Sequence, residues 1–341
     1  MDLKMSSNKI RENFNKPLSA KRIVVKIGSA LLTHKTEAIN KAIVERLVSE
    51  IAMLSTNGIE IILVSSGAIA AGRIALNISD KVHDISLKQV LAAVGQGLLL
   101  QMYEQTFNTH GIRIAQALLT RHDMEERLGY LNVRNTLLKL IELNVIPIVN
   151  ENDVVNIEQL SETTIGDNDT LSALVTNLVD ADILIILGKL EGLYSTDPNI
   201  DKNARFITSV DNIDKTILDM GGDSWPEDGV AVGYGGMSAK LQAAKMVTSA
   251  GATTIMASGL QEDILTKLMA GENLGTHFYP TGDRLESRKR WMLSGIAQKG
   301  NVIIDTGAAG ALRLETNSLL PAGVVDVTGP FSRGDVVTIS D

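Results

Sequence analysis

Two clusters of carboxylates and amides are the residues best suited to chemistry, because each lies beside a strongly apolar segment. The first, Asn150 to Asp153, follows the apolar run 145–149, and the second, Gly166 to Asp169, opens a helical pattern of leucines and valines. Either cluster alone is typical of a solvated turn, since Asn, Asp and Gly favour turn conformations. A glycine turn that leads into a helix is also an anion site, and neighbouring carboxylates can hold a cation that bridges to phosphate. The two clusters together favour a site for an ammonium group, a metal-bound phosphate, or both.

Lysines and glycine turns accompany other apolar segments. Lys26 stands late in the apolar run 22–27 and precedes Gly28, while Lys240 closes the glycine-rich stretch that begins at Gly233. A lysine in such a position is usually structural, with its stem buried and its ammonium group in water, but a glycine beside it also lets a phosphate approach. No segment matches G-x-x-x-x-G-K-[ST] or G-x-G-x-x-G. Two lysines, several glycine turns and a carboxylate cluster are nevertheless the groups that phosphoryl transfer requires.

The elements that carry these residues alternate between strand and helix. The predicted strands are residues 22–27, 59–64, 112–118, 145–149, 183–187 and 253–256, and the helices are 38–57, 67–76, a long helix from the cap Ser86, 131–143, one after Asp169, and 237–250. This alternation indicates a mostly parallel sheet covered on both faces, a three-layer αβα sandwich. Ligands bind at the carboxyl ends of the strands in such sheets. Ser66, which follows the second strand, therefore joins the candidates, although a helix cap is its commoner role.

The long helix from Ser86 carries apolar residues at helical spacing. Apolar side chains that recur every three or four positions are typical of the buried side of a helix. We expect its inner face to consist of Leu87, Val90, Leu91, Val94 and Leu98.

The composition is that of a globular, soluble protein. With 341 residues, of which 44% are apolar, the chain has room for one large and one small domain. No apolar stretch is long enough to span a membrane, and the first twenty residues lack the pattern of a signal peptide. We therefore expect a mobile N-terminal extension over residues 1–20 and a cytoplasmic location.

Several function classes are disfavoured. The chain has no cysteine, which excludes thiolate catalysis, and its five histidines lack HExxH-like or His-x-His spacing. Zinc hydrolysis and a Ser-His-Asp triad are therefore poor fits. A net charge of −8 and an aromatic content of 4% argue against nucleic-acid binding.

The pattern changes after about residue 280. Short strands joined by turn signals are predicted at 302–305, 318–321, 324–327 and 336–339. A small β-rich domain is therefore expected over residues 281–341, after a larger domain over residues 21–280. Residues 276–341 hold seven Lys or Arg and seven Asp or Glu, so RNA binding is not expected.

Six motifs, in order along the chain, carry a resemblance to a known family. They are VVKIGS from Val24, SSGAIAAG from Ser65, LAAVGQ from Leu91, NEND from Asn150, GDND from Gly166 and GGMSxK from Gly235. Together they resemble the glutamate 5-kinases of the amino acid kinase family. The Lys-x-Gly start alone would also fit carbamate, acetylglutamate, aspartate or uridylate kinases, whereas the second and fourth motifs resemble the glutamate 5-kinase branch.

The resemblance implies the amino acid kinase fold and ATP-dependent phosphorylation of the side-chain carboxylate of L-glutamate, which begins proline biosynthesis. The implied cofactors are ATP and Mg²⁺, with the magnesium carried by ATP and no protein ligand assigned to it. The attacking carboxylate oxygen is already ionised at neutral pH. No general base is required, which agrees with the absence of a histidine or cysteine centre.

The matching positions receive their roles from the resemblance. The implied catalytic residues are Lys26 and Lys240, which would neutralise the transferring phosphoryl group, and Asp169, which would orient both lysines. The implied glutamate-binding residues are Ser66, Asp153 and Asn168, with Asn150 and Asp167 close by. The implied ATP-binding residues are Lys26, Gly235, Gly236, Met237, Ser238 and Lys240.

The C-terminal segment resembles the PUA domain appended to many bacterial glutamate 5-kinases. We interpret it as a structural or regulatory appendage, and because the chain stops at Asp341 we expect an open-edged or truncated barrel.

Two places in the larger domain depart from the family pattern: Gly188-Lys189 replaces a Thr-Asp pair, and Tyr234 replaces a threonine. The resemblance implies a homo-oligomer and leaves feedback inhibition by L-proline open. A catalytically impaired regulator and an RNA-binding protein are the alternative functions.

Overall fold

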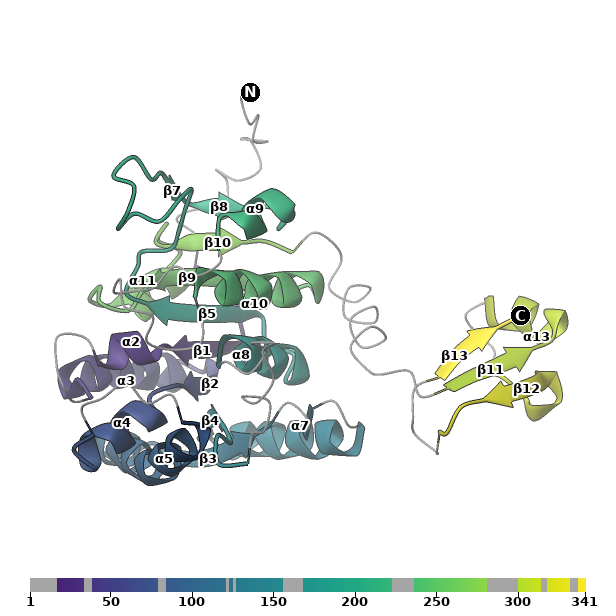
Figure 1. The fold of residues 1–341 in the computed structure, drawn as a ribbon, viewed down its shortest axis with the longest axis horizontal. Helices are drawn as coiled ribbons and strands as arrows, with labels where there is room; N and C mark the ends of the chain where they lie inside the picture. The colour runs from purple at the N-terminus through teal and green to yellow at the C-terminus, as the bar shows by residue number, and fades with distance from the viewer. Residues whose placement is uncertain are drawn as a thin grey trace.

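The computed structural model describes residues 17–33, 39–78, 84–120, 123–124, 127–155, 168–222, 236–280, 300–313, 318–331 and 337–341. These residues form a large α/β unit and a small unit from residue 300 onward (Figure 1). The predicted features outside them include the extension before residue 17, Gly166-Asp167 and the stretch 233–235. Within the described ranges, no helix is both long and apolar enough to cross a membrane.

An eight-stranded sheet forms the centre of the large unit. Its order is β3-β4-β2-β1-β5-β9-β10-β8. The strands are β1 (Arg22–Ile27), β2 (Glu60–Ser65), β3 (Arg113–Leu119), β4 (Val145–Glu151), β5 (Ile183–Gly188), β8 (Ser209–Val210), β9 (Thr253–Ser258) and β10 (Thr276–Phe278). From β3 to β9 all neighbours are parallel, whereas β10 pairs antiparallel with β9. A short hairpin of β6 (Leu193–Tyr194) and β7 (Phe206–Ile207) lies outside this sheet.

Helices cover both faces of the sheet (Figure 1). They are α2 (Ser29–Leu32), α3 (Lys41–Thr56), α4 (Ala68–Ala75), α5 (Ile85–Asn108), α7 (Arg127–Glu142), α8 (Asn168–Leu178), α9 (Lys215–Asp219), α10 (Met237–Ser249) and α11 (Ile264–Met269). Successive β1 residues alternate between two cores: Ile23 and Val25 belong to the core that includes α3 and α5, and Val24 belongs to the core that includes α8 and α10. The predicted three-layer αβα sandwich is confirmed.

The ordered chain of the large unit begins before residue 21. The backbone N–H of Leu18 donates to the carbonyl of Met269 at 3.0 Å, and Leu18 and Ala20 pack on the core that includes α3. Residues 17–20, which the sequence placed in the extension, therefore lie against the folded unit.

The predicted inner face of α5 is wrong in part, although Leu91 is buried as predicted. Val90, Val94 and Leu98 are 50%, 36% and 43% exposed, while Gln96 and Tyr103 are buried. The helix also begins earlier than predicted, because the Asp84 carboxylate caps it by accepting from the N–H of Leu87. Since α5 has apolar residues on every side, periodicity alone does not select the face that packs inward.

Two glycines select that face, because they bring α5 and α4 into backbone contact. A Cβ at Gly95 of α5 would overlap the carbonyl oxygen of Ala68, and one at Gly72 of α4 would overlap that of Leu91. The start of α4 is thus held against the middle of α5, and the loop before α4 is held with it.

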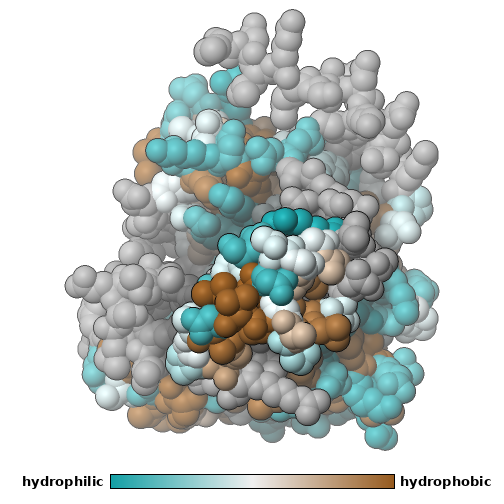
Figure 2. Space-filling view, turned by 90° about the vertical axis from the view of Figure 1, so that its right-hand side faces the viewer, coloured by the Kyte–Doolittle hydropathy of each residue, from teal (hydrophilic) through white to brown (hydrophobic). Residues whose placement is uncertain are grey.

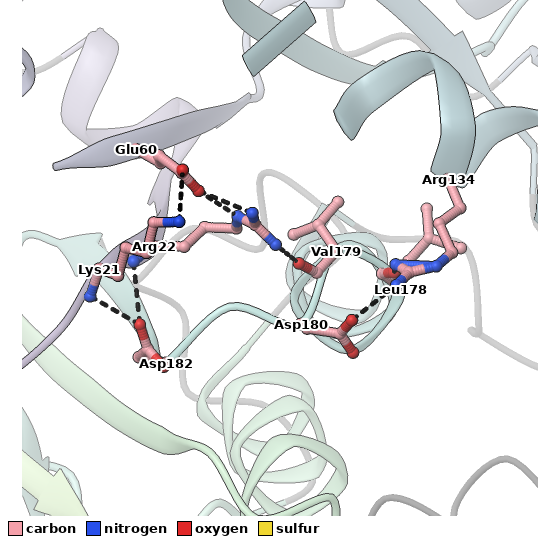
Figure 3. Close-up of polar contacts among 8 residues, drawn as sticks. All are labelled: Lys21, Arg22, Glu60, Arg134, Leu178, Val179, Asp180 and Asp182. Atoms are coloured by element: carbon pink, nitrogen blue, oxygen red, sulfur yellow. Dashed lines mark hydrogen bonds and ion pairs between the residues drawn. The ribbon is translucent and has the colours of Figure 1, made fainter. Parts of the chain in front are cut away.

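A polar network holds the C-terminal end of α8 at the amino ends of the strands (Figure 3). The guanidinium of Arg22 donates to the carbonyl of Val179 and pairs with Glu60, and that of Arg134 donates to the carbonyl of Leu178 at 2.7 Å and pairs with Asp180. Cations at the carboxyl end of a helix satisfy its last carbonyls and complement its dipole. The network fixes the end of α8 so that its N-terminus points to the carboxyl ends of the strands.

The small unit is a three-stranded sheet of order β12-β11-β13 beside one helix. Its elements are β11 (Gly300–Ile304), α13 (Thr306–Arg313), a 3₁₀ turn (Pro321–Gly323), β12 (Val324–Thr328) and β13 (Val337–Ser340). The strand predicted over 318–321 is wrong, since Pro321 starts the 3₁₀ turn, and α13 was not predicted. Figure 2 shows this unit from outside, with apolar side chains on its surface, and Val325, Val327 and Ile339 are at least 47% exposed.

Gly95→Ala should destabilise the protein, because the added methyl group meets a backbone carbonyl that cannot move without shifting α4. Overpacking of this kind costs about 1–3 kcal/mol. Urea unfolding of the full chain would measure it. The matched control is Gly97→Ala, two positions along the same helix, where a Cβ meets nothing within 4 Å. This variant should gain up to about 1 kcal/mol from helix propensity. Equal effects of the two substitutions would contradict the close α4–α5 contact.

Candidate active site

Three charged residues from separate elements meet at the carboxyl ends of the strands. Lys26 lies near the end of β1, Asp169 in the first turn of α8, and Lys240 in the first turn of α10. Lys26 Nζ lies 2.6 Å from Asp169 Oδ1, and Lys240 Nζ lies 3.7 Å from Asp169 Oδ2. All three side chains are buried. The structure therefore brings together the three residues that the resemblance marked as catalytic.

The charge state of Asp169 follows from its neighbours. Burial raises the pKa of Asp169, but the ammonium groups of Lys26 and Lys240 outweigh burial and hold that pKa below its usual value. The carboxylate is therefore ionised at neutral pH and shared by two cations. Two ammonium groups held on one carboxylate at the end of a sheet suit a ligand of high negative charge, such as a phosphate chain.

The α10 N-terminus adds backbone donors at the same edge. Its N-cap residue, Gly236, is extended and has no side chain to cap the helix. The N–H groups of the first turn, which includes Ser238, are thus suited to an anion. Gly235, the other glycine implied in ATP binding, lies outside the described residues.

Asn150 and Asn168 are a second polar group at the carboxyl ends of the strands. Asn150 ends β4 and is 1% exposed, and Asn168 is the first residue of α8. The Oδ1 atom of each is buried and has no hydrogen-bond partner among the described residues. A buried acceptor without a donor is costly, so these two oxygens fit a ligand that brings N–H groups, such as an ammonium.

Asp153 is half-buried just beyond β4. Burial raises its pKa to about 6. A carboxylate with this pKa is ionised at neutral pH. A cationic ligand beside it would stabilise its charge and lower its pKa again. Asp167, the remaining carboxylate of the implied glutamate site, lies outside the described residues.

Ser66 follows β2 in a loop tied to its neighbours. Its backbone N–H donates to the carbonyl of Ile27 at 3.1 Å, which joins the ends of β2 and β1. Gly67 comes next with φ of 107°, a left-handed conformation that favours glycine, and caps α4. This turn leaves the hydroxyl of Ser66 and the first N–H groups of α4 at the same edge as Lys26.

Two supporting residues on α5 were missed by the sequence reasoning. Gln96 accepts a hydrogen bond from Asn150 Nδ2 at 2.6 Å, and the Tyr103 hydroxyl lies 2.9 Å from Ser65 Oγ. The sequence does hold a signal for Gln96, which is the last residue of the motif LAAVGQ and is polar within an apolar stretch. Apolar periodicity alone does not identify such a residue.

The unusual pair Gly188-Lys189 follows β5 and is fixed to the loop after β9. The N–H of Gly259 donates to the carbonyl of Gly188 at 2.8 Å, and the hydroxyl of Ser258 donates to the carbonyl of Lys189 at 3.1 Å. The backbone of this loop is therefore well anchored without the usual Thr-Asp pair. We assign no nucleotide contact to it.

No metal cluster is evident in the described part of the chain, where no three His, Asp or Glu side chains come together in a manner that could hold an ion. The residues at this edge are instead cations, amides and helix N–H groups. Such donors fit phosphate oxygens directly.

The fold and this arrangement of lysines define a class of protein. The amino acid kinase family matches residues 21–257, and the PUA domain matches residues 300–341. The chain therefore belongs to the amino acid kinase family. Solved structures of similar fold include a UMP kinase from Bacillus anthracis (TM-score 0.53, 14% identity, 77% of this chain and 97% of that one) and a carbamate kinase from Giardia lamblia bound to AMP-PNP (0.53, 17%, 76% and 99%).

Closer relatives indicate the branch of the family. Proteins named glutamate 5-kinase from Dehalococcoides mccartyi (strain CBDB1) and Herpetosiphon aurantiacus are 47% and 43% identical to this chain. The matches cover 94% and 93% of this chain and 85% and 84% of theirs. Within its family, the chain belongs to the glutamate 5-kinases.

Asp169→Asn should strongly destabilise the protein, because it leaves two buried ammonium groups without their shared countercharge. Breaking a buried pair costs about 3–5 kcal/mol. Since the folded pKa of Asp169 is lowered, its contribution is present above the unfolded value of 3.8 and is lost as the pH falls through the folded pKa. Urea unfolding from neutral to acid pH would test this.

The control for Asp169→Asn is Glu142→Gln. Glu142 pairs with Lys139 at 2.9 Å, but both side chains are more than 60% exposed, so this substitution should cost less than about 1 kcal/mol. If Asp169→Asn were as mild as the control at neutral pH, the shared carboxylate would not hold the three elements together.

Proposed function

We propose that this protein transfers the terminal phosphoryl group of ATP to the side-chain carboxylate of L-glutamate and forms L-glutamyl 5-phosphate, the first step of proline biosynthesis. The observation that carries the proposal is the carboxylate of Asp169 held by Lys26 and Lys240, together with the amide oxygens of Asn150 and Asn168, which have no partner among the described residues. The pair of lysines would bind phosphate, and the amide oxygens would accept from an ammonium. The similarity to proteins named glutamate 5-kinase supports the same substrate.

The reaction requires charge neutralisation more than proton transfer. A glutamate oxygen forms a bond to phosphorus while the bond to the oxygen of the departing ADP breaks, and ADP keeps that electron pair. No proton moves, because the attacking carboxylate is ionised at neutral pH. Lys26 and Lys240 would stabilise the charge on the transferring phosphoryl oxygens. Asp169 would act on the lysines as a positioning residue.

Glutamate binding would use the second polar group. Its ammonium would contact Asp153 and the amide oxygens of Asn150 and Asn168. The hydroxyl of Ser66 and the N–H groups that start α4 would donate to its carboxylates. Asp167 would complete the site. One ligand would thereby satisfy acceptors and donors from three elements.

ATP would lie over the start of α10. The N–H groups after Gly236 and Met237, together with Gly235 and Ser238, would cover its phosphates. Magnesium bound to those phosphates would offset their charge during transfer. We place the kinase domain at residues 21–280 and the PUA-like domain at 281–341, and we expect the site to reside wholly in the former.

Release of ADP would test the reaction directly. With ATP and magnesium, L-glutamate should support turnover, whereas aspartate, one methylene shorter, and N-acetylglutamate, which lacks the ammonium, should not. N-acetylglutamate is the most informative of these compounds, because the loss of the ammonium contacts is the reason that it should not support turnover. Absence of ADP release with L-glutamate, or equal turnover with N-acetylglutamate, would refute the proposal.

Lys26→Ala and Lys240→Ala should each reduce kcat far more than they weaken glutamate binding. A cation that faces the phosphoryl group acts chiefly on charge that develops in the transition state, where loss of one such group costs about 10²–10³ in rate. Steady-state kinetics would separate the two effects. A variant with near-normal kcat and only a raised KM for glutamate would remove that lysine from the catalytic role.

Asp153→Asn should raise the KM for glutamate more than about tenfold while the KM for ATP stays near its original value, because a charge-assisted contact is worth roughly 1.5–3 kcal/mol. In the parent protein the KM for glutamate should rise as the pH falls below about 6, where Asp153 is protonated. The variant should lose this pH dependence.

Stability gives an independent control for Asp153. Its folded pKa is raised, so its charge lowers stability above about pH 6 and this cost disappears as the pH falls toward 3.8. Asp153→Asn should therefore fold at least as well as the parent at pH 8 while binding glutamate poorly. Parallel losses of stability, ATP binding and glutamate binding would instead mean that Asp153 supports the fold.

A further inference from the structure

A buried amide pair joins α5 to the end of β4. Asn150 Nδ2 donates to Gln96 Oε1 at 2.6 Å, and the two side chains are 1% and 9% exposed. Gln96 contacts neither the lysines nor Asp169 in any described interaction, so its place in the site depends on what it does to Asn150.

The contact determines which end of the Asn150 amide faces the site. An amide has a donor end and an acceptor end. Because Gln96 Oε1 takes the Nδ2 end, Oδ1 must point the other way, and this oxygen is buried without a partner among the described residues. In this orientation, the atom that Asn150 presents on the side away from Gln96 is an acceptor oxygen. It therefore favours an ammonium over a carboxylate at this position.

Gln96 is itself firmly placed. Its neighbour Gly95 lies against the carbonyl of Ala68 near the start of α4. Tyr103, seven residues or about two turns further along the same side of α5, has its hydroxyl 2.9 Å from Ser65 Oγ, next to Ser66. One side of α5 thus fixes the strand end before Ser66 and the strand end that carries Asn150.

We propose that Gln96 is a positioning residue that sets specificity for the substrate's ammonium group, by holding the Asn150 amide with its oxygen toward the ligand. This inference rests on the proposed function, since it takes an amino dicarboxylate as the ligand. It assigns to α5 a role in substrate choice without contact between α5 and the substrate.

A pair of substitutions at Gln96 separates orientation from packing. Gln96→Met keeps the length and bulk but removes the acceptor, whereas Gln96→Glu keeps an acceptor oxygen for Asn150 Nδ2. Gln101→Met is the matched control, because Gln101 is exposed on the same helix. Each full-length variant would be titrated calorimetrically with L-glutamate and with glutarate, which lacks only the ammonium, and assayed for ADP release.

Gln96→Met should weaken L-glutamate binding about tenfold or more and raise its KM in parallel, while kcat and the KM for ATP stay within about twofold, since a lost contact to a charged group is worth that much. Glutarate binding should not change. Gln96→Glu should retain L-glutamate binding within about threefold, and Gln101→Met should match the parent protein.

Two results would contradict a positioning role for Gln96. Similar losses for glutarate and L-glutamate, or a Gln96→Glu variant as impaired as Gln96→Met, would overturn the inference and make Gln96 a packing residue. Binding of L-glutamate to the parent protein without ADP release would refute the proposed reaction instead. The titrations would still decide the role of Gln96 in that case.

Discussion

The sharing of one buried carboxylate by two lysines is the constraint on which the arrangement of this protein depends. Asp169 is 1% exposed, and an ionised carboxylate at that depth is unfavourable unless cations lie beside it. Lys26 and Lys240 meet this need from β1 and α10. The same contacts therefore stabilise the charge of Asp169, bring two ammonium groups together, and fix α8 and α10 relative to the central strand.

The position of Asp169 depends in turn on both ends of α8. At the far end, Arg22 and Arg134 hold the last carbonyls of the helix (Figure 3). A carboxylate in the first turn and cations at the last turn both complement the helix dipole. Helix α8 thus connects the polar network at the amino ends of the strands to the ligand site at their carboxyl ends.

Much of this could be predicted from the sequence, because strong local patterns decide it. Apolar runs bounded by polar clusters predicted the parallel strands, and the carboxyl-end rule brought Lys26, Ser66 and Asn150 to one edge. The face of α5 could not be predicted by the same means. Its side chains are apolar all round, and the packed face is set by backbone contact at Gly72 and Gly95, which a hydrophobicity pattern does not record. For the same reason Gln96 was overlooked.

The unsatisfied amide oxygens connect stability to ligand binding. Asn150 lies at the end of β4 and Asn168 at the start of α8, so two elements each hold a buried acceptor that has no donor among the described residues. Leaving such an acceptor unpaired costs roughly 1–3 kcal/mol. Apolar side chains at the same two positions would not carry this cost. A ligand that supplies N–H groups to both oxygens removes both costs at once and joins β4 to α8. Because only the folded protein offers this pair of acceptors, such a ligand also stabilises the folded state.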